Sequence, residues 1–177
     1  MSPGEHVQAS RATPLTVDPI EFRAIIGHFA TGVTVVTTAA GEELQGMTAN
    51  AVTSVSLDPV MVLVCVDRDT HTHRLLETGG VFAVNILGEH QEEVSRIFAK
   101  RAEPENGTLR GQRFTMGVTG APILEDCLAY IECRVTDLHV AGDHTIFIGE
   151  VVEQRLVNGD VKPLVFCRGA YHSLSGL

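Results

Sequence analysis

The sequence predicts a mainly β fold: a closed or nearly closed antiparallel barrel with two or three peripheral helices. Segments rich in β-branched and apolar residues recur at short intervals along the 177 residues, and few stretches have the apolar period of a helix. Because so few helices cannot cover both faces of a parallel sheet, an antiparallel arrangement fits better. We expect residues 1–17 to form a flexible leader and residues 18–177 a single domain.

The N-terminal part of this domain should contain one helix and three strands. Asp18 and Pro19 are suited to the cap and first position of a helix, and apolar residues at helical spacing continue it to about Ala30. The chain then becomes β-branched, and a continuous apolar run is short enough to be a buried strand. We expect strands at residues 33–38, 44–56 and 60–66, which together should form the centre of the sheet.

The remaining residues predict two more helices and four more strands. Asp69 or Thr70 can cap a helix that Gly79 and Gly80 stop, and residues 90–99 are amphipathic. Residues 100–122 lack a clear period and predict a long surface connection, which is often functional. Strands are expected at residues 81–87, 127–138, 145–156 and 164–167.

Composition and charge narrow the function classes. The formal net charge is -9, so a nucleic acid finds no attractive field and is not expected as a partner. Neither a long apolar run nor a signal peptide is recognisable, which predicts a cytoplasmic protein that does not enter a membrane. The four cysteines form no C-x-x-C pair and are expected to be buried, reduced thiols.

Residues 48–56, with the sequence TANAVTSVS, combine small size with many hydrogen-bonding groups. In one continuous strand, Thr48 and Asn50 would share a face, and Ala49 and Ala51 the other. The absence of bulk would let a flat aromatic ligand approach the backbone while hydroxyls follow a polyol or phosphate tail, as in a flavin. A half-exposed strand whose hydroxyls face water explains the same residues equally well.

Three stretches together resemble a known family. Residues 29–38, 46–59 and 142–144 are similar to the short-chain flavin reductases of two-component flavin-dependent monooxygenase systems. The resemblance implies a split β-barrel, antiparallel with Greek-key connections, that forms a homodimer. It also implies binding of FAD or FMN, reduction of that flavin by NADH or NADPH, and release of reduced flavin to a separate monooxygenase.

The resemblance also implies which residues contact the ligands. The Gly-Asp-His triplet with Asp143 and His144 would meet the nicotinamide, His144 being the catalytic candidate, and Tyr171 would help to close that side. The residues expected around the flavin are Thr31, Gly32, Val33, Thr34, Thr48, Ala49, Asn50, Ala51, Ser54, Val55, Ser56, Cys65, Val66, Asp67, Arg68, Thr70, Phe98 and Ala99.

Two of these residues have a second interpretation. His144 could orient the nicotinamide carboxamide or supply a proton while hydride passes from nicotinamide C4 to flavin N5, or it could be a hydrogen-bonded histidine at a turn. Arg68 could neutralise a phosphate near Thr70, or pair with Asp67 or Asp69. The scarcity of positive charge favours NADH over NADPH.

Other chemistries fit less well. His71 and His73 could converge on a metal only in a loop, and the nearest further candidates are Asp67 and Asp69. Nothing in the sequence shows the three or four convergent ligands of a zinc site, so we expect no metal. A G-x-S-x-G nucleophile elbow and a G-x-G-x-x-G dinucleotide motif are both absent from the sequence. Two alternatives to the reductase remain: a non-catalytic flavin carrier, and a split-barrel oxidase that uses FMN to oxidise a small organic substrate.

Overall fold

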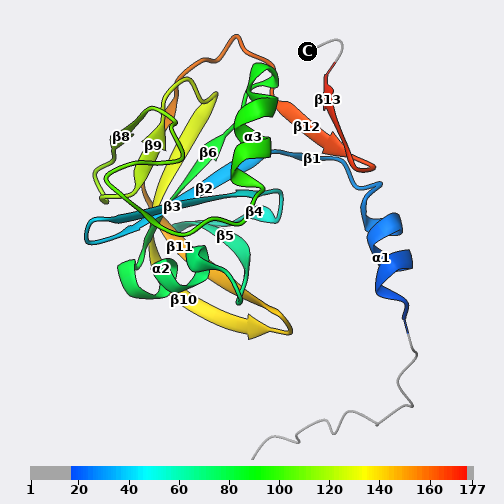
Figure 1. The fold of residues 1–177 in the computed structure, drawn as a ribbon, viewed down its shortest axis with the longest axis horizontal. Helices are drawn as coiled ribbons and strands as arrows, with labels where there is room; N and C mark the ends of the chain where they lie inside the picture. The colour runs from blue at the N-terminus through cyan, green and yellow to red at the C-terminus, as the bar shows by residue number, and fades with distance from the viewer. Residues whose placement is uncertain (1–16, 175–177) are drawn as a thin grey trace, which may run out of the picture.

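A computed structural model describes residues 17–174, in which a strongly curved sheet is flanked by helices (Figure 1). Apart from Val17, the expected leader lies outside these residues. Asp18 caps the first helix, since its Oδ1 accepts a hydrogen bond from the Ile20 backbone N–H at 2.9 Å, with Pro19 following. The helices are α1 (Pro19–Ile26), α2 (His71–Gly79), the short 3-10 helix η1 (Glu89–Gln91) and α3 (Glu92–Phe98).

The strands follow the β-branched and apolar segments of the sequence. They are β1 (Thr31–Gly32), β2 (Thr34–Ala40), β3 (Glu43–Ala49), β4 (Val52–Leu57), β5 (Val60–Asp67), β6 (Val81–Ile86), β7 (Glu105–Asn106), β8 (Phe114–Met116), β9 (Pro122–Leu124), β10 (Ala129–Ala141), β11 (His144–Leu156), β12 (Leu164–Cys167) and β13 (Ala170–Ser173).

Eight strands form one antiparallel sheet in the order β4-β5-β11-β10-β6-β2-β3-β7. β3 and β4 are joined only by Asn50 and Ala51, which we call the β3–β4 corner, yet they lie near opposite ends of this order. The sheet must therefore curl until its two ends meet at the corner. This curvature confirms the predicted mainly β, split-barrel fold.

The prediction of which strands form the centre of the sheet is wrong. The strands at residues 33–38, 44–56 and 60–66 were expected together, but β2 and β3 lie towards one end of the sheet, and β4 and β5 at the other. The cause is the corner itself, because the chain leaves one end of the sheet there and begins the other. Long strands β10 and β11 occupy the middle, paired over twelve registered positions.

Two apolar clusters support this sheet. One fills the inside of the curve, where Val64, Phe82 and Phe147 are fully buried. The other lies between the sheet and α3, and includes Val35 and Phe98. Among residues 17–174, no helix has the length and apolar character needed to cross a membrane.

Several boundaries differ from the expected ones. α1 ends at Ile26 rather than near Ala30, because Gly27 caps it and the chain turns. The extended segment expected over residues 44–56 is two strands. The connection over residues 100–122 contains β7 and β8, and β13 was not expected, because strands of two to four residues carry too little pattern to be recognised.

Candidate functional site

The β3–β4 corner breaks the alternation expected for residues 48–56. β3 ends at Ala49, which is 7% exposed and packs in the core, whereas Asn50 and Ala51 are both exposed. The prediction that Ala49 and Ala51 share a face is therefore wrong, because the chain turns between them. The Cys65 backbone N–H donates to the Ala51 carbonyl at 3.0 Å and ties the corner to β5. The small Ala51 side chain leaves the backbone of the corner accessible.

An uncharged cavity of about 410 Å³, which we call the apolar hollow, opens beside the corner. One of its walls is the thiol of Cys65, whose pKa is raised by burial, so that the group stays neutral near neutral pH. The residues lining the apolar hollow are Ile26, Gly27, Phe29, Thr31, Asn50, Ala51, Val52, Thr53, Leu63, Cys65 and Phe166.

Thr31 contributes a polar group to this apolar surface. Its Oγ1 is buried and has no hydrogen-bond partner within residues 17–174. A buried hydroxyl without a partner costs about 1–3 kcal/mol, and most native proteins avoid that cost. A ligand in the apolar hollow that offers one polar atom would satisfy this group.

A larger cavity of about 840 Å³, the polar hollow, lies between β3, the turn from β5 to α2 and the segment after α3. It contains both signs of charge, since Lys100, Arg101 and Arg110 face Asp67 and Asp69. The lining residues are Arg23, Gln45, Gly46, Met47, Thr48, Asp67, Asp69, Thr70, His71, Thr72, Phe98, Ala99, Lys100, Arg101, Ala102, Glu103 and Arg110.

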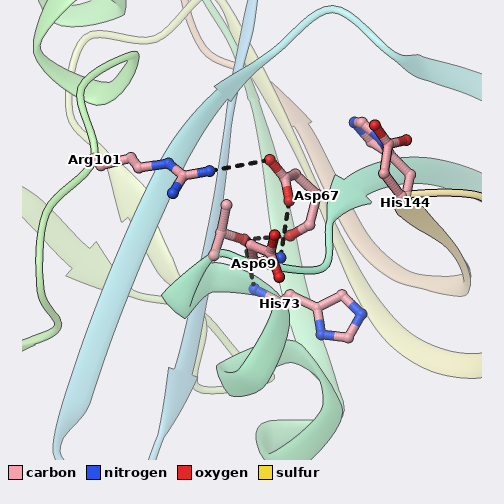
Figure 2. A network of polar contacts seen from close by, with 7 residues as sticks. Asp67, Asp69, His73, Arg101 and His144 are labelled. Atoms are coloured by element: carbon pink, nitrogen blue, oxygen red, sulfur yellow. Dashed lines mark hydrogen bonds and ion pairs between the residues drawn. The ribbon is translucent and has the colours of Figure 1, made fainter.

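Two side-chain contacts span the polar hollow, from the end of β5 and the start of α2 to the segment after α3. Arg101 Nη2 lies 3.3 Å from Asp67 Oδ2 (Figure 2). His71 Nε2, at the start of α2, contacts the Glu103 carboxylate. The Arg101 side chain is 75% exposed, so this pair is weak in water and its guanidinium is available to an anion. The polar hollow therefore presents a cation that a phosphate can reach.

The start of α2 forms one edge of the polar hollow. Thr70 caps the helix, with Oγ1 accepting from the His73 backbone N–H at 3.2 Å and donating to the Asp67 carbonyl at 2.6 Å. The Asp69 backbone N–H donates to Asp67 Oδ1 at 2.8 Å. These contacts fix the turn between β5 and α2 (Figure 2). They also occupy the Thr70 hydroxyl, which the sequence predicted to contact a phosphate.

The two hollows adjoin along one face of β5. Val62, Val64 and Val66 point into the core, whereas Leu63, Cys65 and Asp67 are half-buried on the opposite face. Leu63 and Cys65 line the apolar hollow and Asp67 the polar one, and residues two apart on a strand are separated by about 7 Å. A ligand with an apolar ring and a charged tail can therefore occupy both.

His144 stands beside this junction on the neighbouring strand. In the β11–β5 register, His144 pairs with Asp67 and Ile146 with Cys65. Directly paired residues point to the same side of a sheet, so His144 shares the face that carries both hollows. Its Nδ1 lies 2.7 Å from Asp143 Oδ1, and the pKa of Asp143 is lowered, first by this hydrogen bond and then by the imidazole charge.

The predicted flavin residues divide into three groups, the first two of which line a hollow or turn their side chains inwards. Those that line a hollow are Thr31, Asn50, Ala51 and Cys65 on the apolar side, and Thr48, Asp67, Thr70, Phe98 and Ala99 on the polar side. Val33, Ala49 and Val66 turn their side chains into the core, and Thr34 Oγ1 donates to the Ala49 carbonyl. Any ligand contact from those four is through the backbone, and their predicted role stays a prediction.

The other predicted residues lie around the hollows without lining them. Gly32, Ser54, Val55, Ser56 and Arg68 are exposed or half-buried, and the Arg68 backbone N–H donates to the Asp143 carbonyl at 3.0 Å. Tyr171 lies against α3, with its hydroxyl 2.9 Å from Ser95 Oγ and its ring beneath the Arg96 guanidinium. The Thr48 hydroxyl donates to the Ser95 carbonyl at 2.6 Å.

Sequence reasoning missed the basic and amide groups of the polar hollow. Gln45 Nε2 donates to the Ala102 carbonyl at 2.8 Å, and Arg110 Nη1 donates to the carbonyls of Ile97 and Lys100 at the end of α3. One signal was present, because Lys100 and Arg101 are adjacent cations directly after Phe98 and Ala99 in an acidic chain. Gln45 and Arg110 had no such signal, because they reach the hollow only through the fold.

The expected thiols are partly confirmed. All four cysteines are free, and Cys127 and Cys133 are buried, with burial raising their pKa to about 11 and about 12. Cys65 and Cys167 are only half-buried, contrary to the expectation for all four. His71 and His73, considered above for a metal, lie in different surroundings: His71 faces Glu103, and His73 points to Thr145.

Comparisons with known proteins show the family to which the chain belongs. The chain is 41% identical over 162 residues to an NADH-dependent flavin reductase of Rhodococcus sp, covering 89% of this chain and 88% of the relative. It is 39% identical over 155 residues to the reductase component of a 4-nitrophenol 4-monooxygenase/4-nitrocatechol 2-monooxygenase of Rhodococcus opacus, covering 88% and 80%.

A solved structure is similar over nearly the whole chain. It is the NADH:FAD oxidoreductase of Streptomyces globisporus C-1027 in complex with NAD and FAD fragments, with a TM-score of 0.82 and 36% identity, covering 92% of this chain and 98% of that one. The model of the flavin reductase like domain matches residues 26–175. The chain therefore belongs to the flavin reductase-like family.

Proposed function

We propose that this protein is an NADH-dependent flavin reductase that reduces FAD or FMN and releases the reduced flavin to a separate monooxygenase. The observation that carries the proposal is the junction of an apolar and a polar hollow on one face of β5, with His144 beside it. A flavin has the matching anatomy, because a flat ring system continues into a polyol and a phosphate.

In this proposal the flavin ring lies in the apolar hollow against the β3–β4 corner. Ala51 is small enough to allow close approach, and the unpartnered Thr31 hydroxyl meets a polar atom of the ring. The phosphate extends to the polar hollow and Arg101, exchanging with Asp67 for the guanidinium. Both contacts are to open cavities rather than to a closed chamber, which suits a flavin that leaves after reduction.

The chemistry belongs to the ligands, because a bound flavin accepts the hydride of NADH and one proton while NADH becomes NAD⁺. The protein holds the nicotinamide against the flavin. His144 faces the same side as both hollows, and its ring is oriented by Asp143. It positions the carboxamide through its exposed ring edge. The chain has a formal net charge of -9, and this scarcity of positive charge favours NADH over NADPH.

The test is a steady-state assay that crosses FAD and FMN with NADH and NADPH. Continuous loss of nicotinamide absorbance, dependent on free flavin and faster with NADH, is the expected result. A rate equal to the protein-free control would reject the proposal. Tightly held flavin without nicotinamide turnover would instead identify a carrier, and oxygen uptake dependent on an organic substrate would identify an oxidase.

The proposal includes a homodimer. No residue of α1 is buried within this chain, and its apolar side chains are exposed, from 50% for Ile26 to 78% for Ile20. Figure 1 shows α1 standing away from the sheet. A helix of eight residues is not stable alone in water, so a second copy of the chain is the partner that would cover it.

The oligomeric state is measured by light scattering after size-exclusion chromatography. The native chain should have the mass of a dimer, and Phe22→Glu with Ile25→Glu should give the mass of a monomer. Glu77→Lys, on the exposed side of α2, is a control for charge and should remain dimeric. A monomeric native chain would reject the homodimer while leaving the reductase assay to decide the activity.

The separate monooxygenase and the cytoplasmic location belong to the same proposal. The two proteins need not form a complex stable enough for a pull-down, because free flavin can diffuse between them. The useful measurement is coupled turnover, in which an added flavin-dependent monooxygenase hydroxylates its substrate only when this protein, NADH and flavin are all present. Product formed equally well without this protein would contradict the supply of reduced flavin.

A further inference from the structure

His73 is a buried polar residue that lines neither hollow. Its side chain is 7% exposed, and its ring fills the space between α2 and β11. Nε2 lies 2.7 Å from Thr145 Oγ1, and Nδ1 lies 3.4 Å from Glu77 Oε2. The ring packs edge-on to Phe147, with centroids 5.3 Å apart and planes at 71°. These three contacts fix the orientation of the ring.

Thr145 directly follows His144, and the two side chains point to opposite faces of β11. Thr145 is 1% exposed and faces the core, whereas the His144 side chain is 45% exposed on the face with the hollows. Whatever fixes the Thr145 side chain therefore fixes the backbone from which His144 projects. Among residues 17–174, the contact between His73 and Thr145 is the one side-chain hydrogen bond that joins α2 to β11.

The other end of His73 is attached to the flavin side of the site. Its backbone N–H donates to Thr70 Oγ1, which donates to the Asp67 carbonyl. The Asp67 end of β5 lies against His144 in the sheet, and Figure 2 shows the His73 ring directed away from the Asp67–Arg101 pair. His73 thus links the turn that borders the polar hollow to the strand that carries His144.

We propose that His73 is a positioning residue for the nicotinamide step: its hydrogen bond to Thr145 sets the place of His144 relative to the β5–α2 turn. The inference rests on the proposed function, in which His144 faces the nicotinamide. With its proton on Nδ1, the neutral ring donates towards Glu77 and accepts from the Thr145 hydroxyl. Because His73 and Thr145 are both buried, the hydrogen bond between them is held more firmly than one between exposed side chains.

The experiment uses pairs of variants that differ by one polar group. Thr145→Val removes the hydroxyl and keeps the shape, whereas Thr145→Ser keeps the hydroxyl. His73→Phe removes the ring nitrogens, whereas His73→Gln keeps a polar atom near the position of Nε2. Thr145→Val and His73→Phe should raise the KM for NADH roughly threefold to tenfold, the range that one net hydrogen bond represents. The Ser and Gln variants should remain close to the native value.

Two further readouts separate positioning from a general loss of structure. Flavin affinity should be unchanged in Thr145→Val, and the double variant with His73→Phe should be no worse than either single one, because both remove the same contact. The ¹⁵N signals of the His144 imidazole, measured without any nucleotide, should shift or broaden in Thr145→Val and not in Thr145→Ser. Each assay is run well below the melting temperature of the variant.

The outcomes decide the matter whether or not the proposed function holds. An unchanged KM for NADH in a folded Thr145→Val protein, or unmoved His144 signals in that protein, would overturn the positioning role. A fall in Tm with native kinetics would show that the contact is structural only, which also overturns it. If the native protein fails to oxidise NADH with any flavin, the proposed function fails, and the imidazole signals still decide whether His73 positions His144.

Discussion

The apolar and the polar hollow share a strand and differ in almost everything else. The apolar hollow has no charged residue in its lining and one unpartnered hydroxyl, whereas the polar hollow has four Lys or Arg side chains and three Asp or Glu side chains. On β5 the change takes place between Cys65 and Asp67. The difference shows that the two hollows would contribute to flavin affinity in different ways. Shape and burial would act on the ring in the apolar hollow, and charge would act on the phosphate in the polar hollow.

The largest expected effect is a loss of flavin affinity when the shape of the apolar hollow is changed. Ala51→Leu should weaken flavin binding about tenfold to a hundredfold, because overfilling a close-packed contact costs about 1–3 kcal/mol. Flavin fluorescence titration measures it. Ala51→Ser, which is also small, should bind almost normally. Ala49→Leu should instead lower Tm, since Ala49 lies in the core at 7% exposure. Native flavin affinity in Ala51→Leu would place the ring elsewhere.

The next effect concerns charge in the polar hollow. Arg101→Ala should weaken FAD and FMN about threefold to tenfold, less than a buried charged hydrogen bond because the side chain is 75% exposed. Riboflavin has no phosphate and should bind unchanged. Arg113→Ala removes an equally exposed cation, 76%, that pairs with Glu125 away from both hollows, and it controls for net charge. Equal losses for riboflavin and FMN would contradict phosphate binding at Arg101.

A smaller effect is expected at Thr31, where one substitution should change protein stability and flavin affinity in different ways. Thr31→Val should leave the Tm of the ligand-free protein unchanged or raise it, because the buried hydroxyl has no partner there. The same change should weaken flavin about threefold to tenfold, if the ligand supplies the missing hydrogen bond. Thr31→Ser keeps the hydroxyl and should bind as the native protein does. Loss of both stability and affinity in Thr31→Val would mean that the hydroxyl has a protein partner.

The smallest expected effect is a change in the pKa of Asp143. The pKa of Asp143 is lowered by His144, so His144→Ala should raise it towards the ordinary 3.8, as measured from the carboxyl ¹³C shift. His139→Ala, which removes an exposed imidazole paired with Asp137, should leave it unchanged. Because the pKa of Asp143 is lower in the folded protein than its ordinary value, the interaction with His144 stabilises the fold at pH values above the ordinary pKa. This stabilisation is lost as the pH falls through the lowered pKa. An unchanged pKa of Asp143 in His144→Ala would show that the Asp143 carboxylate and the His144 imidazole are not in contact.

The sequence predicted the fold well because its long elements carry strong patterns. The apolar run of β5, the Gly79–Gly80 stop of α2 and the Asp18–Pro19 start of α1 each act within a few residues. The predicted centre of the sheet was wrong because the turn at Asn50 and Ala51 has no Gly or Pro to mark it.

The site divides in the same way. The Thr48, Cys65, Phe98 and His144 regions were found by resemblance to a family, and they all border the two hollows or their junction. Arg110 was not found, because it reaches the hollow with a backbone φ of 51° after a long connection, and no local pattern predicts such a contact. The Thr48 and Thr70 hydroxyls were expected to be open to a ligand, but they already donate to the carbonyls of Ser95 and Asp67.

The meeting of the two sheet ends at Asn50 and Ala51 has a consequence for dynamics. A continuous ring of strands shares its protection from solvent around the circumference, whereas here a gap separates the two sheet ends, and the bond from the Cys65 amide to the Ala51 carbonyl extends the β4–β5 ladder to the edge of that gap. Deuterium should therefore enter at Cys65 sooner than in the middle of β10. A flavin lying across the gap would slow that entry, so the exchange rate of a single amide would report occupancy without any absorbance measurement.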